Sequence, residues 1–118
     1  MALRIVFAGT PAVAVPTLRL LAATHEVVAV VTRPDAPLGR RRVLTPSPVA
    51  QAAAELGIPV IKAARLDDAA TTEITALDAD LGVIVAYGGL VREPLLSAPK
   101  SGWINLHFSL LPRWRGAA

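Results

Sequence analysis

The chain has 118 residues, 53% of them hydrophobic and 4% aromatic, which suffices for one domain with an aliphatic core. It contains no cysteine and two histidines, so disulfides, a thiol nucleophile and cysteine-ligated or multi-histidine metal sites are excluded. The formal net charge is +3, and no apolar run reaches the ~20 residues that a membrane helix needs. The first residues enter a strand pattern without the long apolar segment of a signal peptide, so we expect a cytoplasmic protein.

The opening residues predict two buried strands joined by a helix. Residues 3–8 and 27–31 are β-branched, apolar runs bounded by polar or breaking residues, as in strands covered on both faces. Thr10 and Pro11 suit the start of a helix that the leucine spacing continues to about residue 24. A unit of this length implies a right-handed parallel crossover. Gly9 lacks the G-x-G-x-x-G context of a dinucleotide site, and we expect it to allow a tight turn.

Residues 32–48 form the most unusual stretch of the chain. They hold four prolines, one glycine and four arginines, a density of helix and strand breakers that predicts a long loop without regular structure. Arg40, Arg41 and Arg42 are adjacent, and guanidinium groups present forked donors to phosphate. We interpret them as a phosphate-binding patch for nucleic acid. The alternative is a solvated run of charge.

The remaining elements continue the alternation of helix and strand. Ser47 and Pro48 are suited to begin a helix and Gly57 to end it, and Asp67 and Asp68 are suited to begin the next one, to about residue 77. Strands are expected at residues 59–61, 81–87 and 103–111, with a short helix at 91–96. About five strands alternating with helices predict an open, mostly parallel, doubly wound α/β sheet.

The last strand carries the candidate catalytic pair. Asn105 and His107 are two residues apart, so their side chains share one face, while Ile104 and Leu106 are expected to point into the core. An amide donor beside an imidazole suits acyl transfer, which needs an oxyanion donor and a proton shuttle. In a buried strand each unpaired polar group costs about 1–3 kcal/mol and so needs a reason. The alternative, which spacing alone leaves open, is the polar face of an edge strand.

The order of the predicted elements also indicates where a site forms. Ligands of doubly wound sheets bind beyond the carboxyl ends of the strands. We therefore expect Gly9-Thr10, Tyr87-Gly88 and the pair Asn105 and His107 to cluster at one edge of the sheet. The sequence does not fix the order of the strands.

Longer motifs resemble a known family. The pattern Asn105-x-His107-x-Ser109-Leu110-Leu111-Pro112, followed by Arg115-Gly116, resembles the formyltransferases that use 10-formyltetrahydrofolate. Three further stretches narrow the resemblance to the branch of that family that acts on methionyl-tRNA: Phe7-Ala8-Gly9-Thr10-Pro11, the loop from Arg33 to Arg40 with its continuation at 46–49, and residues 111–118. Together they cover essentially the whole chain.

The resemblance implies a Rossmann-like formyltransferase domain, of which residues 1–118 would be the N-terminal portion, with the family's C-terminal β-barrel domain outside this chain. It implies transfer of a formyl group from 10-formyltetrahydrofolate to the α-amino group of methionyl initiator tRNA, in translation initiation. No metal, membrane or obligate protein partner is implied.

The resemblance also assigns roles to single residues. The catalytic positions are Asn105 and His107, and the family's acidic partner has no match, because no aspartate follows His107. The folate-binding positions are Ser109, Leu110, Leu111 and Pro112. The arginine loop contacts tRNA through Arg40, with Arg41 and Arg42 beside it.

Three other functions stay open from the residues. They are formyl transfer to a small-molecule amine, such as a purine precursor or an amino sugar, hydrolysis of formyl-folate, and RNA binding without catalysis. The arginine loop favours the tRNA acceptor, because neither transfer to a small molecule nor hydrolysis requires a cluster of phosphate-binding arginines. We expect the 118 residues alone to have little or no activity.

Overall fold

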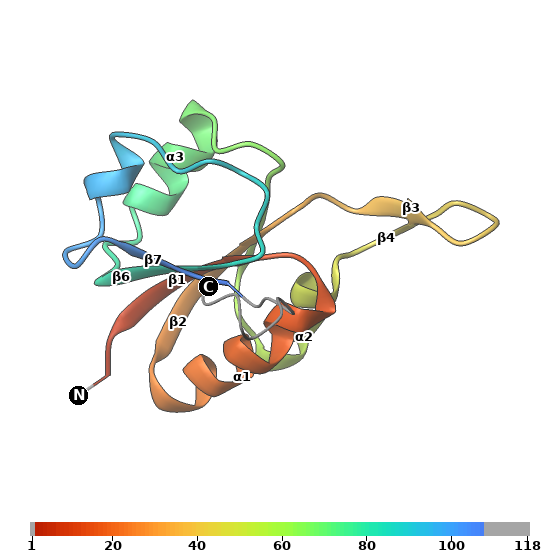
Figure 1. Ribbon diagram of the computed structural model, residues 1–118, viewed down its shortest axis with the longest axis horizontal. Helices are drawn as coiled ribbons and strands as arrows, with labels where there is room; N and C mark the ends of the chain where they lie inside the picture. Colours follow the sequence, from red (N-terminus) through yellow and green to blue (C-terminus); the bar gives the residue numbers. More distant parts are fainter. Residues whose placement is uncertain (1, 108–118) are drawn as a thin grey trace, which may run out of the picture.

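A five-stranded parallel sheet organises the chain in the computed structural model, which describes residues 2–107 (Figure 1). The strand order is β5-β2-β1-β6-β7. The chain thus winds outward from β1 in one direction and then returns to start on its other side, which is the doubly wound order. The expected open, parallel α/β sheet is confirmed. The strands of this sheet are β1 (Arg4–Gly9), β2 (Glu26–Thr32), β5 (Val60–Lys62), β6 (Leu81–Val85) and β7 (Trp103–Leu106).

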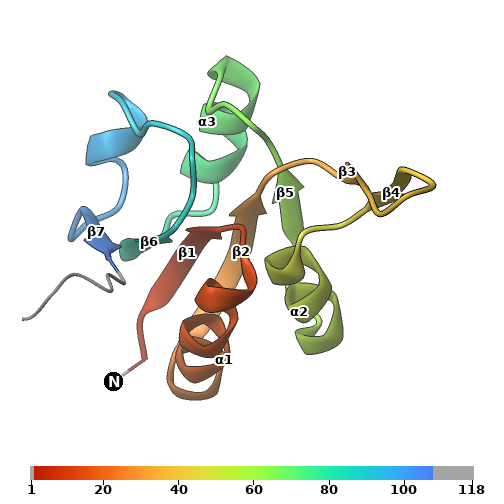
Figure 2. The same cartoon turned by 45° about the vertical axis from the view of Figure 1, so that its right-hand side comes forward.

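Helices cover both faces of the sheet (Figures 1 and 2). The helices α1 (Val15–Thr24) and α2 (Pro48–Leu56) lie on one face, and α3 (Asp68–Thr75) with the 3-10 turn η2 (Leu95–Ser97) lies on the other. Strand β1 serves both layers, because Ile5 and Phe7 join the first core while Val6 and Ala8 join the second. Both cores are almost wholly aliphatic, as the composition predicts. Within residues 2–107, no helix is long and apolar enough to cross a membrane.

Two helices begin where the sequence predicts; α2 also ends there, whereas α3 ends at Thr75, before the expected residue 77. In α2 the Ser47 Oγ accepts the Ala50 N–H at 3.0 Å, Pro48 is the first residue, and Gly57 ends the helix at φ +72°. In α3 the Asp67 Oδ1 accepts the Ala70 N–H at 2.9 Å. These local signals act within one turn of the chain and are confirmed.

The start of α1 differs from the prediction. A 3-10 turn, η1 (Ala12–Ala14), precedes it, and no side chain caps either element. The Thr10 hydroxyl is instead directed toward Thr32, with 3.5 Å between the two Oγ1 atoms. Gly9 is required by close packing rather than by a tight turn, because an added Cβ would lie 2.7 Å from the Val85 carbonyl oxygen of the neighbouring strand.

The stretch expected to be an irregular loop contains a β-hairpin. Strands β3 (Ala36–Leu38) and β4 (Val43–Thr45) pair antiparallel and form a separate two-stranded sheet. The prediction of no regular structure is therefore wrong. A two-stranded ribbon has only edge strands, so it tolerates Pro37 opposite Leu44. Positive φ angles at Gly39 and Arg42 reverse the chain between the strands.

The last elements are shorter than predicted. The expected helix at 91–96 is only the turn η2, and β7 ends at Leu106, so His107 lies just past the strand. Residues 108–112 lie outside the described part of the chain. Strand β7 packs closely on β6: an added Cβ at Gly82 would lie 2.2 Å from the Trp103 ring, whose Nε1–H donates to the Leu95 carbonyl oxygen at 3.1 Å.

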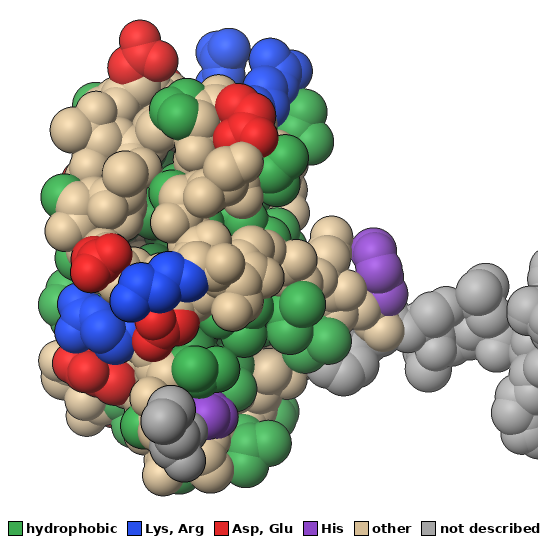
Figure 3. Space-filling view, turned by 90° about the vertical axis from the view of Figure 1, so that its left-hand side faces the viewer, with side chains coloured by type: hydrophobic (Ala, Val, Ile, Leu, Met, Phe, Trp, Pro, Cys, Tyr) green, Lys and Arg blue, Asp and Glu red, His purple; other side chains and the backbone are tan. Residues whose placement is uncertain are grey.

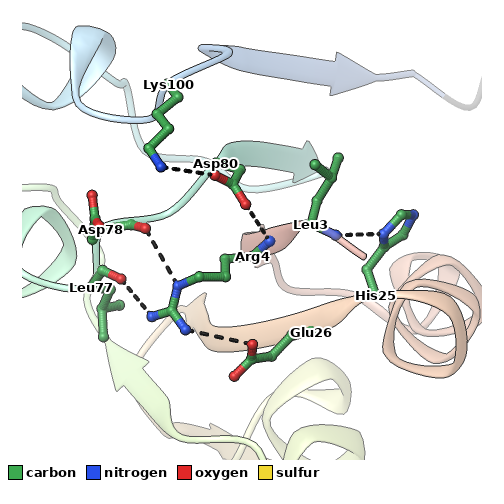
Figure 4. Close-up of polar contacts among 8 residues, drawn as sticks. All are labelled: Leu3, Arg4, His25, Glu26, Leu77, Asp78, Asp80 and Lys100. Carbon is green, nitrogen blue, oxygen red and sulfur yellow. Dashed lines mark hydrogen bonds and ion pairs between the residues drawn. The ribbon is translucent and has the colours of Figure 1, made fainter. Parts of the chain in front are cut away.

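A polar cluster closes the edge at which the strands begin (Figure 4). The Arg4 guanidinium donates to the Leu77 carbonyl oxygen at 2.8 Å and lies 3.5 Å from the Glu26 carboxylate. The Arg4 backbone N–H donates to Asp80 at 2.8 Å and lowers the pKa of that carboxyl; desolvation opposes this shift, and Lys100 adds to it. These contacts hold together the starts of β1 and β2 and the segment before β6.

Candidate functional site

The carboxyl ends of three strands form the edge where the candidate residues were expected. Gly9 of β1 pairs in register with Val85 of β6, and Val85 pairs with Leu106 of β7. The segments that follow these residues therefore leave the sheet side by side. This placement agrees with the expectation that Gly9-Thr10, Tyr87-Gly88 and the Asn105 and His107 pair share one edge.

Asn105 lies on the exposed edge strand β7, and His107 directly follows that strand, so neither is in a buried strand. Strand β7 pairs with β6 and has no other partner in residues 2–107, so Ile104 is 45% exposed and Leu106 is 38% exposed. The expectation that these two side chains point into the core is wrong, because burial depends on the strand order. Asn105 and His107 are exposed as well, so the cost of burying a polar group gives no evidence that they are functional.

The same exposure leaves the pair accessible to a substrate. Within residues 2–107, neither side chain makes a hydrogen bond, so the Asn105 amide and the His107 imidazole have free donors and acceptors there. Figure 3 shows the left-hand side of Figure 1, where histidine side chains reach the surface and acidic and basic groups are intermixed. His25 differs from His107, since its Nδ1 accepts the Leu3 N–H at 2.9 Å in a structural contact.

A cavity of about 450 Å³ lies between the segments that follow β5 and β6. Its walls are residues 64–67 on one side and residues 88–90 with Arg92 on the other. The Tyr87 hydroxyl donates to the Ala63 carbonyl oxygen at 2.6 Å and ties the two walls together. Burial raises the pKa of Tyr87, so its hydroxyl remains a donor at neutral pH.

The sequence indicated the glycines that line this cavity but not its two arginines. Tyr87-Gly88 was expected at the same edge of the sheet as the candidate pair, and Gly88 and Gly89 line the cavity. Arg65 and Arg92, which bring positive charge to it, were not singled out. Their position after two strand ends was the available signal, but their convergence depends on the strand order, which the sequence does not give.

The three consecutive arginines form a second, separate feature. Arg40, Arg41 and Arg42 are exposed at the tip of the β3–β4 hairpin, which extends away from the sheet (Figures 1 and 2). Within residues 2–107, no carboxylate forms an ion pair with them. The structure does not bring them to Asn105: the hairpin projects from one side of the molecule and β7 lies on the other. An acceptor that touches both must therefore be large.

Two predictions concern residues or groups that the structure does not place. Ser109, Leu110, Leu111 and Pro112, the folate positions implied by the resemblance, lie outside the described residues. In residues 2–107, no three His, Cys, Asp or Glu side chains converge as a metal site would require.

A family model and two relatives both identify the chain as similar to formyl transferases. A family model described as formyl transferase matches residues 3–118. The chain is 73% identical over 117 residues to a protein of Clavibacter sepedonicus named methionyl-tRNA formyltransferase. It is 69% identical over 116 residues to the protein of the same name from Leifsonia xyli subsp. xyli. In both comparisons the match covers 98% of this chain and 38% of the relative, so the chain spans well under half of their length.

Solved structures show the same fold at low identity. Glycinamide ribonucleotide transformylase 1 from Geobacillus kaustophilus superposes with a TM-score of 0.64 at 19% identity, over 95% of this chain and 61% of that one. Phosphoribosylglycinamide formyltransferase from Streptococcus pneumoniae gives a TM-score of 0.62 at 18% identity, over 89% of this chain and 56% of that one. At these identities the likeness concerns the fold alone.

Proposed function

The chain belongs to the formyl transferase family, and from this premise we propose that the full-length protein containing it formylates methionyl initiator tRNA in translation initiation, with 10-formyltetrahydrofolate as the donor. Residues 1–118 serve in it as the N-terminal portion of the catalytic domain. The observation that carries the proposal is that an accessible amide and imidazole at the end of β7 and a cavity lined by the segments after β5 and β6 lie at the same end of the sheet, where the strands finish. The names of the relatives at 69–73% identity support the acceptor.

The proposed chemistry assigns one task to each side chain of the pair. The α-amino nitrogen of methionine attacks the formyl carbon, and the carbonyl electron pair moves to oxygen. The Asn105 amide donates a hydrogen bond to that oxyanion. His107 takes the proton that the amine loses as the new C–N bond forms. The intermediate then collapses to the formamide, the bond from carbon to the folate nitrogen breaks, and that nitrogen leaves with the proton that His107 returns to it.

A folate-type donor suits the cavity beside this edge. Its volume of about 450 Å³ lies within the range of small-molecule sites. Folates carry a glutamate tail, and guanidinium groups bind carboxylates with paired hydrogen bonds. We propose that Arg65 and Arg92 hold the tail, while Ser109, Leu110, Leu111 and Pro112 contact the rest of the donor. Replacing Arg65 or Arg92 with alanine is expected to raise the KM for the donor, whereas Arg19→Ala on α1 leaves it unchanged.

The hairpin arginines support a nucleic-acid acceptor over a small amine. Their exposed cluster has a single sign of charge and stands well away from Asn105, out of reach of a small molecule bound there. A charged tRNA is large enough to contact the hairpin with its phosphates while its aminoacyl end reaches the sheet edge. We propose that Arg40, Arg41 and Arg42 bind the RNA backbone.

A competition among acceptors tests the proposal. The full-length protein is incubated with 10-formyltetrahydrofolate and, in separate reactions, methionyl-tRNA, a purine-precursor amine, an amino sugar or water alone. We expect formyl-methionyl-tRNA as the product, with donor consumption that depends on the tRNA. Equal donor loss without any acceptor would identify a hydrolase, and transfer only to a small amine would identify the other class of formyltransferase. RNA binding without donor loss would identify a binding protein.

A further inference from the structure

A buried pair of hydroxyl groups joins the two ends of the arginine hairpin. Thr32, the last residue of β2, lies just before the hairpin segment, and Ser47, the N-cap of α2, lies just after it. Their Oγ atoms are 2.6 Å apart, so one hydroxyl donates to the other, and both side chains are 0% exposed. The hydrogen bond therefore closes the base of the hairpin inside the protein, where solvent does not compete for it.

Helix capping explains Ser47 but not Thr32. The Ser47 Oγ accepts the Ala50 N–H at 3.0 Å and would cap α2 without a second hydroxyl beside it. Valine has the shape of threonine, suits a buried strand and carries no polar group to bury. A threonine at this position is therefore best accounted for by its bond to Ser47. Thr10 lies at the far side, with 3.5 Å between its Oγ1 and that of Thr32, and so connects the pair to the turn after β1.

The other side-chain ties at the base of the hairpin are less buried. The Arg33 guanidinium donates to the Thr45 carbonyl oxygen at 3.4 Å in a partly buried contact. Lys62 Nζ is 2.8 Å from Asp35 Oδ1, and these side chains are 43% and 33% exposed. The Gln51 amide donates to the Pro46 carbonyl oxygen at 2.9 Å, also in an exposed contact. Salt screens such an ion pair, and water competes for such a hydrogen bond. The hydrogen bond between Thr32 and Ser47 is neutral and buried, so neither salt nor water weakens it in this way.

The geometry of the hairpin turns a small change at its base into a large one at its tip. From Pro34 to Arg40 an extended chain spans about 20 Å, at ~3.3 Å per residue. A tilt of about 10° at the base then moves the arginines by roughly 3.5 Å, more than the tolerance of a forked hydrogen bond to phosphate. The tip itself has no support from the sheet, because β3 and β4 pair only with each other in residues 2–107.

We propose that Thr32 is a positioning residue: its buried hydrogen bond to Ser47 fixes the angle of the arginine hairpin, and so the placement of the bound RNA relative to the sheet edge. The expected effect on the RNA acceptor rests on the proposed function. The hydrogen bond and its effect on the angle of the hairpin do not. It predicts that loss of the Thr32 hydroxyl loosens the hairpin and weakens the use of the RNA acceptor, while the donor and the chemical step are unaffected.

The hairpin angle is measured first, without reference to activity. Spin labels are attached in the full-length protein to cysteines replacing Arg41 at the tip and Ala54, which is exposed on α2, after any cysteine outside these 118 residues has been replaced. Pulsed electron resonance then gives the distance distribution between the labels. Thr32→Val is expected to broaden or shift it, and Thr32→Ser, which keeps the hydroxyl, to retain it. An unchanged distribution in Thr32→Val overturns the proposal.

Steady-state formylation then measures the consequence, on protein without labels. We expect Thr32→Val to raise the KM for methionyl-tRNA about tenfold, as when part of a set of three phosphate contacts is lost. The kcat and the donor KM stay within twofold, and Thr32→Ser restores the tRNA KM. Ile74→Val, which removes a buried methylene from the inward face of α3, is the matched control for lost stability. An equal rise in the tRNA KM in this control, or no rise in Thr32→Val, overturns the positioning role.

The two proposals fail in different ways. If the wild-type protein forms no formyl-methionyl-tRNA, the proposed function is wrong, and the distance measurement alone decides whether Thr32 holds the hairpin. If the wild-type protein is active and the distances in Thr32→Val are those of the wild type, only the inference about Thr32 is wrong.

Discussion

Replacing Arg40, Arg41 and Arg42 together with alanine tests the hairpin as an RNA contact. All three side chains are exposed at the tip, and in residues 2–107 no carboxylate neutralises them. Each is therefore free to displace one counterion from the RNA backbone. Their removal is expected to weaken binding of methionyl-tRNA and to flatten its dependence on salt.

The size of the effect follows from the number of contacts. Each neutralised phosphate contributes about 0.7–0.9 to the slope of log K against log salt, so three arginines contribute at most about 2.1–2.7. Between 50 and 200 mM salt, a fourfold rise, this difference corresponds to roughly a 20–40-fold greater loss of affinity in the wild type than in the variant.

Titration of labelled methionyl-tRNA across a salt series measures both slopes. Replacement of the same three residues with lysine keeps the charge and should keep the slope, although it loses the forked geometry. Arg19→Ala, on α1 and paired with Glu55 at 2.9 Å, controls for loss of charge elsewhere and should leave the slope unchanged. Parallel salt plots for the wild type and the triple alanine variant would refute the assignment of the hairpin to RNA.

Two further predictions concern the sheet that carries the site. The pKa of Asp80 is lowered from 3.8 chiefly by the Arg4 backbone N–H, so its contribution to stability is complete above the unfolded pKa and is lost as pH falls through the lower folded pKa. Asp80→Asn should therefore flatten the fall of the unfolding free energy below about pH 5, and an unaltered pH profile would contradict this. Gly82→Ala places a Cβ 2.2 Å from the Trp103 ring and should destabilise the full-length protein by about 1–3 kcal/mol in denaturant unfolding. Gly88→Ala meets nothing within 4 Å and serves as the control; equal midpoints for the two variants would contradict the packing argument.

The parts of the fold that the sequence predicted are those set by neighbouring residues. The start of α2 at Ser47 and its end at Gly57 depend on backbone groups within one turn, and so does the cap of α3 at Asp67. The continuous apolar runs identified buried strands because a strand covered on both faces has no polar positions. Alternation of strands with helices then limited the topology to a parallel, doubly wound sheet.

Two of the errors arise because the outcome depends on residues distant in the chain. Thr10 suits a helix cap by type, but its hydroxyl faces Thr32 across the strand ends. Ile104 and Leu106 alternate as core residues do, yet they are exposed because β7 is the edge strand of the described residues. The hairpin was not predicted for a different reason: a proline such as Pro37 disrupts a central strand but is tolerated in a two-stranded ribbon, in which both strands are edges.

The candidate site was predictable in its position more than in its environment. In this fold class the carboxyl ends of the strands lie side by side. Asn105 and His107 were therefore correctly expected beside the segment after β6. Their exposure and the convergence of Arg65 and Arg92 required the strand order. Their catalytic and folate-binding roles remain proposals.

Single-turnover formylation by the full-length protein tests the central claim most directly. Asn105→Asp keeps the shape of the side chain but replaces the N–H donor with a carboxylate, and Ile104→Val alters only its exposed neighbour on β7. With saturating methionyl-tRNA and 10-formyltetrahydrofolate, we expect Asn105→Asp to slow transfer by about 10²–10³, as for a lost oxyanion donor, and Ile104→Val to transfer at nearly the wild-type rate. A wild-type rate in Asn105→Asp would contradict the account.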